Sequence, residues 1–273
     1  MDKNKIALQL YSVRDDAKED LYGVLKAVKS YGYSGVEFTH GLSGHDPLEV
    51  KAMCEEIGLV PLSSHVPYLA LKEDLEATID CYVKLGVPYV AIPYLNAEYR
   101  YGTVGFPEFL ENLPAIGKAL KEKGIVMQYH NHDFEFVKTD SGEYMLDLLY
   151  RTVGPEYLQT QLDTCWVNVG GEDPAAYVTK YAGRTPTVHL KDFAGCRSEN
   201  MYALIGIDDD KKQEASGQFQ FRPLGKGLQN IPAIIEAADA AGAEWYIVEQ
   251  DAPSMGLTPM ECAKASVEYL LGL

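Results

Sequence analysis

One ten-residue run of the sequence concentrates side chains that could bind a metal or transfer a proton. The run is MQYHNHDFEF, residues 127–136, and it contains His130, His132, Asp133 and Glu135. Imidazole nitrogens and carboxylate oxygens are common ligands of catalytic metals, and they are also common proton donors and acceptors in enzymes. The run alone leaves both roles open, so its partners elsewhere in the chain decide its chemistry.

Further polar side chains lie inside segments that are otherwise apolar. They are Gln9, Glu37, His65, Asp163, His189, Lys191, Asp192, Glu249 and Asp251. A buried charge needs a counter-charge or a metal, because a charged group that moves out of water without such a partner loses favourable hydration free energy. One ligand set would suit Mn²⁺, Mg²⁺, Co²⁺ or catalytic Zn²⁺. It consists of Asp163, His189, Glu249 and an acidic group from the MQYHNHDFEF run. The alternative is a set of structural ion pairs, such as Lys191 with Glu249.

The elements that would position these side chains form a repeating pattern. The expected strands are residues 6–13, 35–38, 59–66, 89–95, 125–132, 158–165, 185–192 and 245–251. Seven of them follow a glycine that we expect just past a helix end, where the left-handed conformation is accessible. These glycines are Gly32, Gly58, Gly86, Gly124, Gly154, Gly183 and Gly242. Apolar residues at helical spacing, as at Leu21, Val24 and Leu25, predict the intervening helices.

Strict alternation of eight strands with helices predicts one (β/α)8 TIM barrel over residues 1–273. An open doubly wound sheet is the alternative, but no GxGxxG motif follows the first strand. In a barrel the carboxyl ends of the strands meet at one face, where active sites form. The polar residues of the strand ends would therefore gather at one site.

Residues 192–228 form an unusually long connection after the seventh strand. Its run IDDDKKQEASG predicts a solvated turn or hairpin tip, and residues 219–227 alternate as a strand before a glycine-containing turn. A long loop on the active face of a barrel can act as a lid or as a surface for a partner. A homo-oligomer would be compatible with such a surface.

The composition favours a cytoplasmic protein that acts on a small molecule. The formal net charge is −16, from 40 acidic and 24 basic residues, whereas nucleic-acid binders usually present a basic face. No apolar run reaches the roughly 18 residues of a membrane span, and the start of the chain predicts a strand rather than a signal peptide. The five cysteines include no CxxC pair, which is typical of free thiols.

Six short motifs together resemble a known superfamily. They are LQLYSVR, GVEF, YHNHDFEF, LDTCWV, VHLKD and VEQD. They resemble the strand-end motifs of the sugar phosphate isomerase/epimerase superfamily, the xylose-isomerase-like barrels, over essentially the whole chain. The YHNHDFEF form is similar to a branch of epimerase-like proteins near inosose dehydratases and 3-keto-glycoside-processing enzymes.

The resemblance implies a divalent metal, with Mn²⁺ as the expected ion and Mg²⁺, Co²⁺ or Zn²⁺ as alternatives. Its ligands in the superfamily are Glu, Asp, His and Glu from strands five to eight. Asp163, His189 and Glu249 match three of these positions. For the fourth ligand we expect Glu135, with His130 or His132 as the substitute.

A second group of residues is expected to contact hydroxyl or carbonyl oxygens of the substrate. They are Glu37, His65, His130, Lys191, Gln250 and Arg222. Glu37 could instead be a structural partner of Lys191, and Arg222 could be an ordinary surface residue. The sequence contains no glycine-rich phosphate-binding loop, so the substrate need not be a phosphate ester.

The leading hypothesis is a metal-dependent sugar isomerase or epimerase. It would remove a proton next to a carbonyl group, pass through an enediolate and return the proton elsewhere. Glu135 and Glu249 are the expected acid–base pair, with His132 as a competitor. The alternative is a lyase in which the same enediolate expels a leaving group, as in an inosose-type dehydratase or an enzyme that eliminates from 3-keto-glycosides.

Two other classes are less compatible with the sequence. An endonuclease for abasic DNA shares the fold, but it needs more metal ligands and a basic groove. A barrel that binds a sugar or a partner without catalysis is the other alternative, against which the complete Asp163, His189 and Glu249 set argues.

Overall fold

A computed structural model of the chain describes residues 1–197 and 219–273. The barrel strands are β1 (Ile6–Gln9), β2 (Gly35–Thr39), β3 (Val60–His65), β4 (Tyr89–Ile92), β5 (Val126–His130), β6 (Gln159–Asp163), β7 (Thr187–Leu190) and β10 (Trp245–Val248). They close in the order β1-β10-β7-β6-β5-β4-β3-β2, and all neighbours are parallel. Because β1 pairs with both β2 and β10, the sheet has no free edge. The expected (β/α)8 barrel is therefore confirmed.

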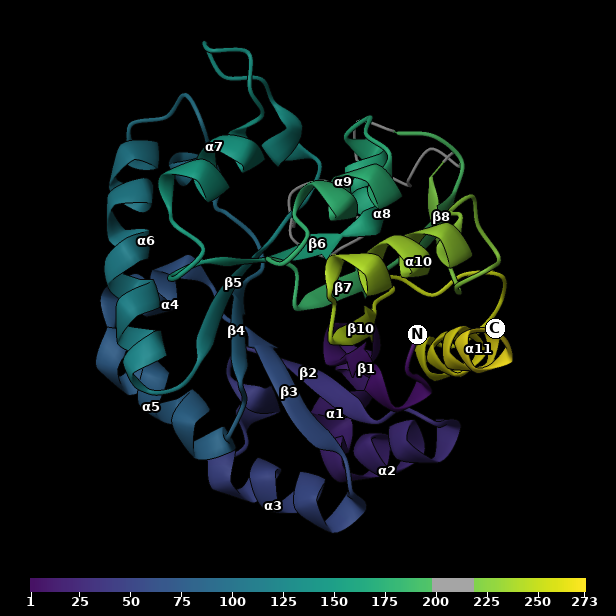
Figure 1. Cartoon of the computed structure of the whole chain (residues 1–273). Coiled ribbons are helices and arrows are strands. Elements are labelled where there is room, and N and C mark those ends of the chain that lie inside the picture. Colours follow the sequence, from purple (N-terminus) through teal and green to yellow (C-terminus); the bar gives the residue numbers. More distant parts are fainter. Residues whose placement is uncertain (198–218) are drawn as a thin grey trace.

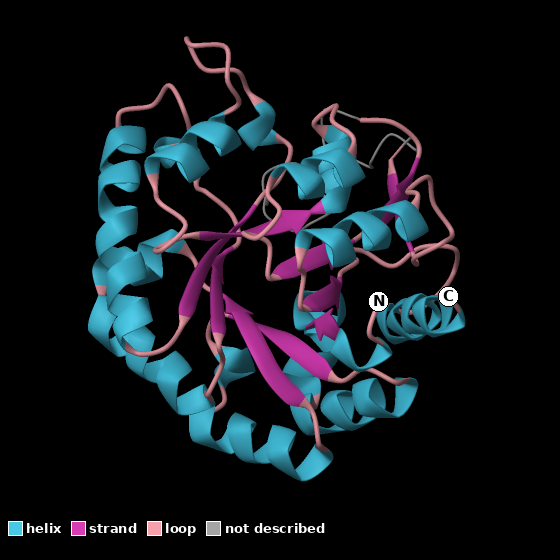
Figure 2. Ribbon diagram, in the orientation of Figure 1, coloured by secondary structure: helices cyan, strands magenta, loops and turns pink. Residues whose placement is uncertain are grey.

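Helices surround the barrel on its outside (Figure 1, Figure 2). They are α1 (Arg14–Glu19), α2 (Leu21–Tyr31), α3 (Pro47–Ile57), α4 (Tyr68–Glu73), α5 (Leu75–Leu85), α6 (Gly105–Glu122), α7 (Met145–Thr152), α8 (Thr164–Val169), α9 (Pro174–Lys180), α10 (Ile231–Ala241) and α11 (Pro259–Gly272). Asp46 begins α3, because its side chain accepts from the N–H of Leu48, and Pro47 follows it. The apolar positions expected for α2, including Leu21 and Leu25, are buried.

Six of the seven expected glycines have a positive φ, and Gly32, with φ 113°, directly follows α2. Gly154 differs. The helix α7 ends at Thr152, and Val153 already adopts an extended conformation with φ −100° and ψ 113°. The chain has left the helix before Gly154, so no left-handed residue is required there.

The first strand is shorter than the expected segment 6–13. The strand β1 ends at Gln9, and residues 10–13 form a 3₁₀ turn. The side chain of Gln9 accepts a hydrogen bond from the N–H of Tyr11 at 2.9 Å, which stabilises the turn. This turn places Tyr11 at the carboxyl end of the barrel.

The interior of the barrel is polar near the carboxyl ends of the strands. Its fully buried polar residues include Gln9, Glu37, Gln128, Gln161 and Thr187. Gln128 Nε2 donates to Thr187 Oγ1 at 2.9 Å, and Gln161 Nε2 donates to Glu37 Oε2 at 2.7 Å. A separate apolar cluster closes the other end, and it consists of Ala7, Leu62, Tyr89, Trp245 and Ile247. The polar residues therefore form a layer beneath the strand-end site.

The long connection after β7 contains a short antiparallel pair, β8 (Asp192–Ala194) and β9 (Gln220–Arg222). Asp192 lies at its base, and its carboxylate accepts from the N–H groups of Phe193, Gly225, Gly227 and Gln229 at 2.9–3.0 Å. Asp192 is therefore a structural residue of this turn. The expected hairpin tip within IDDDKKQEASG lies outside the described residues.

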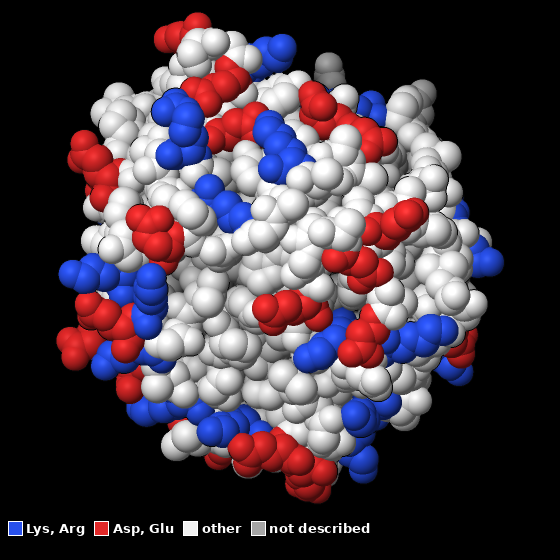
Figure 3. All heavy atoms as spheres, in the orientation of Figure 1, with Lys and Arg blue, Asp and Glu red and all other residues white. Residues whose placement is uncertain are grey.

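Among the described residues, no helix is long and apolar enough to cross a membrane. Figure 3 shows acidic and basic side chains interspersed around one face of the molecule, with a largely uncharged centre. The negative net charge is thus not gathered into a single acidic patch on this face.

Candidate metal centre and pocket

Four side chains with metal-binding atoms converge at the carboxyl ends of adjacent strands. They are His130 at the end of β5, Asp163 at the end of β6, His189 in β7 and Glu249 directly after β10. Their ligand atoms all lie within 4.8 Å of one another, and all four side chains are buried. Because side chains alternate across a strand, these positions face the barrel interior together.

The distances within this cluster fit a single cation. His189 Nδ1 lies 3.0 Å from Glu249 Oε2. His130 Nε2 lies 3.6 Å from Asp163 Oδ2 and 4.0 Å from Glu249 Oε2. Two imidazole nitrogens with two carboxylate oxygens form a borderline donor set that suits Zn²⁺, Co²⁺ or Mn²⁺.

Neighbouring groups hold two of these side chains in orientation. Asp163 Oδ1 accepts from the N–H groups of Cys165 at 2.8 Å and Trp166 at 3.2 Å, at the start of α8. Its other oxygen is thereby left facing the cluster. His189 Nε2 lies 2.8 Å from Glu37 Oε1, so that Nδ1 faces the cluster. Contacts of this kind fix the geometry of metal ligands.

Buried carboxylates outnumber the buried ammonium groups around the cluster. Lys191 Nζ lies 3.1 Å from Asp163 Oδ2 and 3.0 Å from Glu249 Oε2. The same ammonium lies 2.8 Å from Asp251 Oδ2. Glu37, which is fully buried, adds a fourth carboxylate. A divalent cation would supply positive charge that one lysine cannot, so the residues present fit such an ion.

The carboxyl groups of this site have different pKa values. Burial would raise the pKa of Glu249, but Lys191 and His189 hold it well below its usual range. Burial raises the pKa of Asp163. Burial, opposed by Lys191 and reinforced by Glu249, raises the pKa of Asp251 to about 6. Glu249 therefore stays ionised, while Asp251 can exchange a proton near neutral pH.

The two histidines of the cluster and the nearby His132 also differ in pKa. Burial would lower the pKa of His189, but Glu37 and Glu249 raise it to about 10. Without a metal, His189 thus carries a proton on each nitrogen at pH 7. Burial lowers the pKa of His130 and of His132 well below the usual range. Both are neutral imidazoles, and each retains one nitrogen lone pair.

The structure does not bring Glu135 to the cluster. Tyr129 Oη donates to Glu135 Oε1 at 2.7 Å, and the N–H of His132 donates to Glu135 Oε2 at 2.8 Å. Tyr129 is the outward neighbour of His130 in β5 and packs against Phe109 of α6. Glu135 therefore lies on the helix side of the strand, and burial raises its pKa to about 8.

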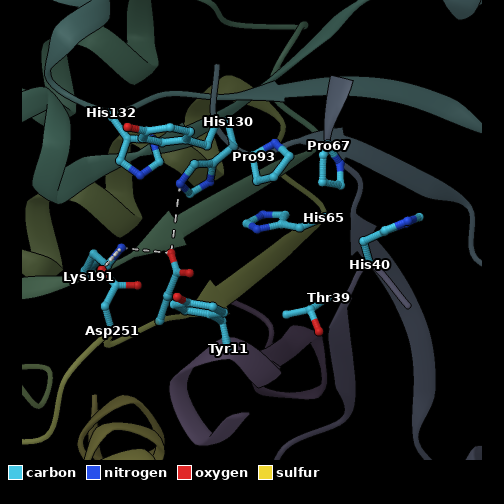
Figure 4. A pocket seen from close by; sticks show the side chains of 12 residues that line it. Tyr11, Thr39, His40, His65, Pro67, Pro93, His130, His132, Lys191 and Asp251 are labelled. Atoms are coloured by element: carbon cyan, nitrogen blue, oxygen red, sulfur yellow. Dashed lines mark hydrogen bonds and ion pairs between the residues drawn. The ribbon is translucent and has the colours of Figure 1, made fainter. Parts of the chain in front are cut away.

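A cavity of about 310 Å³ lies over the cluster. It is lined by Tyr11, Thr39, His40, His65, Pro67, Pro93, Tyr94, His130, His132, Lys191, Glu249 and Asp251. Figure 4 shows Lys191 and Asp251 at one end, and Thr39 and His40 at the other. The cavity has the size of a small-molecule site.

Aromatic rings hold His132 in the cavity wall. The ring centroids of Tyr94 and Trp166 lie 5.2 Å from that of His132, and Phe134 stacks on it at 5.7 Å. Lys191 Nζ lies 5.4 Å from the Trp166 ring. One indole thus contacts both His132 and Lys191, which fixes these two polar groups near each other.

Some of the expected acid–base and substrate-contact residues line the cavity, and the others do not. Of the acid–base group, His132 and Glu249 line the cavity, whereas Glu135 does not. Of the contact group, His65, His130 and Lys191 line it.

The other three expected contacts lie elsewhere in the described structure. Glu37 is sealed beneath the cluster, with no exposed surface. Gln250 Nε2 donates to Ala252 O at 2.9 Å, away from the cavity. Arg222 Nη1 lies 3.5 Å from Phe221 O, on β9.

Sequence reasoning did not assign several lining residues to the site. They are Tyr11, Thr39, His40, Pro67, Pro93, Tyr94 and Asp251. All of them end a strand or follow one closely, which is the signal that could have identified them. Asp251 is a polar strand-end residue for which the sequence predicts no role. The prolines carry no reactive group, so residue type alone could not identify them.

Comparison with known proteins identifies the family. Residues 25–272 match the family model described as xylose isomerase-like TIM barrel. The chain belongs to the xylose isomerase-like TIM barrel family. The resemblance drawn from the six motifs is thereby confirmed.

Among the relatives of this family member are proteins named inosose dehydratase. One from Clostridium beijerinckii is 26% identical over 65% of this chain and 58% of its own length. One from Mesomycoplasma hyopneumoniae is 27% identical over 62% of this chain and 54% of its own length. The chain thus spans little more than half the length of these relatives.

Solved structures share the fold. A sugar phosphate isomerase/epimerase from Parabacteroides distasonis superposes with a TM-score of 0.78 and 24% identity, over 98% of both chains. The IOLI protein with a bound zinc atom superposes with a TM-score of 0.71 and 16% identity, over 98% of this chain and 97% of that one. At these identities the likeness concerns the barrel itself.

Proposed function

We propose that the protein is a divalent-metal-dependent dehydratase that acts on a sugar-like polyhydroxy ketone. The observation that carries the proposal is a single cavity with the His130–Asp163–His189–Glu249 cluster at its base and proton-transfer groups in its wall. A cavity of about 310 Å³ suits one small polyol. The relatives named inosose dehydratase support this substrate class.

His130, Asp163, His189 and Glu249 are the proposed metal ligands, with His130 taking the position for which Glu135 was expected. When bound there, a divalent cation supplies positive charge that polarises a carbonyl oxygen and stabilises the anion formed by loss of a neighbouring proton. The donor set suits Mn²⁺, our first expectation, and also Co²⁺ or Zn²⁺. Zinc is the ion named for the IOLI structure.

His132 is the proposed proton acceptor. Its imidazole lines the cavity, and burial keeps it neutral, so that one nitrogen can take a proton from the carbon next to the carbonyl group. Its aromatic neighbours restrict the ring to one position. A fixed base loses little entropy when the substrate reacts.

Asp251 and Lys191 are proposed to handle the departing hydroxyl group. Asp251 lines the cavity, and its pKa of about 6 lets a fraction of the carboxyl groups carry a proton near neutral pH. That proton would convert the leaving hydroxide into water. Lys191 stays charged because burial, which would lower its pKa, is outweighed by Asp163, Asp251 and Glu249. It therefore stabilises negative charge rather than acting as a base.

An isomerase or epimerase is the second candidate. His65 and His132 both line the cavity, from β3 and from the exit of β5. Two imidazoles on different walls could take a proton from one side of a carbon atom and return one from the other side. This arrangement favours epimerisation, whereas the Asp251–Lys191 pair favours loss of water.

The two candidates differ in products formed in D₂O. We would incubate the Mn²⁺-loaded protein with an inosose and with a panel of ketoses and aldoses, and follow them by NMR. A dehydratase forms a dehydrated product, and an epimerase incorporates deuterium beside the carbonyl group without loss of water. Protein stripped with a chelator is the control. If neither reaction depends on a divalent metal for any substrate of the panel, the proposed function is wrong.

His132→Gln is the matched test of the proton acceptor. Because Gln cannot accept a proton near neutral pH, kcat should fall by about 10²–10⁴-fold while metal binding is retained. A variant that keeps near-wild-type kcat would exclude His132 from this role.

A further inference from the structure

Glu37 is a fully buried carboxylate at the centre of the barrel's polar layer. Its Oε1 lies 2.6 Å from Gln9 Nε2 and 2.8 Å from His189 Nε2. The same oxygen lies 3.1 Å from His65 Nε2. Its Oε2 accepts from Gln161 Nε2 at 2.7 Å. Four side chains from four strands therefore converge on one carboxylate.

An ionised carboxylate accepts hydrogen bonds and cannot donate them, so each of its partners must present an N–H group. The amide nitrogen of Gln161 therefore faces Glu37, and its Oε1 faces His65 Nε2 at 2.9 Å. His65 Nε2 thus lies between two acceptors and must carry a hydrogen.

The requirement for a hydrogen on Nε2 determines what the other ring nitrogen, Nδ1, of His189 and of His65 can offer to its neighbours. Nδ1 of His189 faces Glu249 Oε2 in the metal cluster at 3.0 Å. His65 lines the cavity, and no hydrogen-bond partner of its Nδ1 is found within residues 1–197 and 219–273. In a neutral ring with a hydrogen on Nε2, Nδ1 carries the lone pair.

We propose that Glu37 is a positioning residue that sets the proton position on both imidazoles, so that His189 offers Nδ1 to the metal and His65 offers Nδ1 to a substrate hydroxyl group. The inference rests on the proposed metal-dependent function. It also narrows the substrate, which must place a hydroxyl group toward β3 while its carbonyl group lies at the cluster.

A neutral residue of the same size would not impose this pattern. In Glu37→Gln the side chain presents one N–H₂ group and one carbonyl oxygen. If the oxygen faces His189, the new amide nitrogen faces Gln161, which must then turn its own oxygen toward it. The amide nitrogen of Gln161 would face His65 Nε2 at the shorter of its two contacts, 2.9 Å against 3.1 Å to the oxygen at position 37, which favours the tautomer with the hydrogen on Nδ1. The cavity would then meet a donor in place of an acceptor.

Gln128 provides a matched control. It is also fully buried in the polar layer, but it donates to Thr160 O at 2.8 Å and Thr187 Oγ1 at 2.9 Å and not to a histidine. Gln128→Met therefore disturbs the same layer without removing a direct contact of Glu37, since Gln128 is linked to Gln161 only through Thr187. A role for Glu37 in packing alone predicts similar effects from both variants.

The test combines zinc affinity, measured by competition with a chromogenic chelator, with ¹⁵N NMR of the imidazoles in the full chain. Wild-type protein should show the His65 hydrogen on Nε2. Glu37→Gln should weaken zinc binding by about 10–100-fold, as expected for loss of a ligand's charged partner, and should move the His65 hydrogen to Nδ1. Gln128→Met should change zinc affinity by less than about 3-fold and leave the His65 tautomer unchanged.

The inference is overturned if Glu37→Gln retains both the zinc affinity and the His65 tautomer of the wild type, or if Gln128→Met weakens binding equally. A wild-type His65 that carries its hydrogen on Nδ1 overturns it without any variant. If wild-type protein binds no divalent metal, the proposed function fails, while the His65 tautomer in the metal-free protein still decides the role of Glu37.

Discussion

At the residue scale, strand alternation decides which groups of MQYHNHDFEF face the His130–Asp163–His189–Glu249 cluster. His130 and Gln128 point into the barrel, whereas Tyr129 between them points to the helices and pairs with Glu135. With His130 in place of the expected Glu135, the proposed ligand set carries one negative charge fewer. The donor set thereby shifts toward ions that accept imidazole readily.

His130→Ala tests this assignment. Removing one of four proposed ligands should weaken zinc binding by at least about 100-fold, because first-contact ligands matter at least as much as their supporting partners. Isothermal titration of chelator-stripped protein measures the affinity. The matched control is Glu135→Gln, which should bind zinc within about 3-fold of wild type. The opposite ranking of the two variants would restore Glu135 as the ligand.

Metal binding should depend on pH through His189. In the metal-free protein its pKa of about 10 lies above the usual value, so below pH 10 the metal must displace a proton from Nδ1. The affinity for Zn²⁺ should therefore rise by about tenfold per pH unit between pH 7 and pH 9. Titrations in buffers of different ionisation enthalpy would count the protons released. An affinity that is constant over this range would contradict the assignment of His189.

At the scale of elements, the exit of β5 is stabilised by a buried carboxyl group that is not part of the cavity. Glu135 accepts from Tyr129 Oη and from the N–H of His132. It thus links the strand to the backbone that carries the proposed base. Its pKa of about 8 lies above the ordinary value near 4.5, so the protonated form is favoured by folding.

This shift gives a prediction for stability. The contribution of protonated Glu135 to the free energy of unfolding is fully present below about pH 4.5, and it is lost as the pH rises through about 8. Relative to Glu135→Gln, whose side chain does not titrate, the free energy of unfolding of the wild type should fall by up to about 1.4 kcal/mol per pH unit in this window. Urea unfolding at several pH values measures the difference. Identical pH profiles for the two proteins would refute the raised pKa.

Asp192 tests the role of the turn after β9. Its carboxylate accepts hydrogen bonds from four backbone N–H groups, that of Phe193 in β8 and those of Gly225, Gly227 and Gln229 in the turn. Asp192→Ala should lower the free energy of unfolding by about 3 kcal/mol, and Asp192→Asn, which keeps one oxygen, by less. Urea unfolding gives both values. Zinc affinity should stay near that of the wild type, and its loss without a loss of stability would instead make Asp192 part of the site.

Much of this architecture was predictable from local patterns, because helix caps, glycine joints and apolar strands are short-range signals. The barrel, and Asp163, His189 and Glu249 as one group, follow from strand ends meeting at one face. The place of Glu135 was not predictable, since it depends on where β5 ends and how its exit turns. Gln250 shows the same limit, because a residue directly after Glu249 faces the opposite side.

At the scale of the whole molecule, the barrel places a charged site above a layer of buried polar side chains. The apolar cluster closes one end, the hydrogen-bonded Gln, Glu and Thr layer follows, and the carboxylate-rich cluster lies above it. Buried carboxylates are tolerated there because Lys191 and His189 neutralise part of their charge. The remaining negative charge would favour a bound cation, and the polar layer orients His189, one of the proposed ligands.

A crystal structure of the zinc-loaded protein, with anomalous diffraction collected at the zinc edge, tests this account most directly. We expect one strong anomalous peak among the four strand ends. It should lie about 2.0–2.2 Å from His130 Nε2, from His189 Nδ1 and from one oxygen each of Asp163 and Glu249. A peak coordinated by Glu135, or no peak at this site with zinc in excess, would contradict the account.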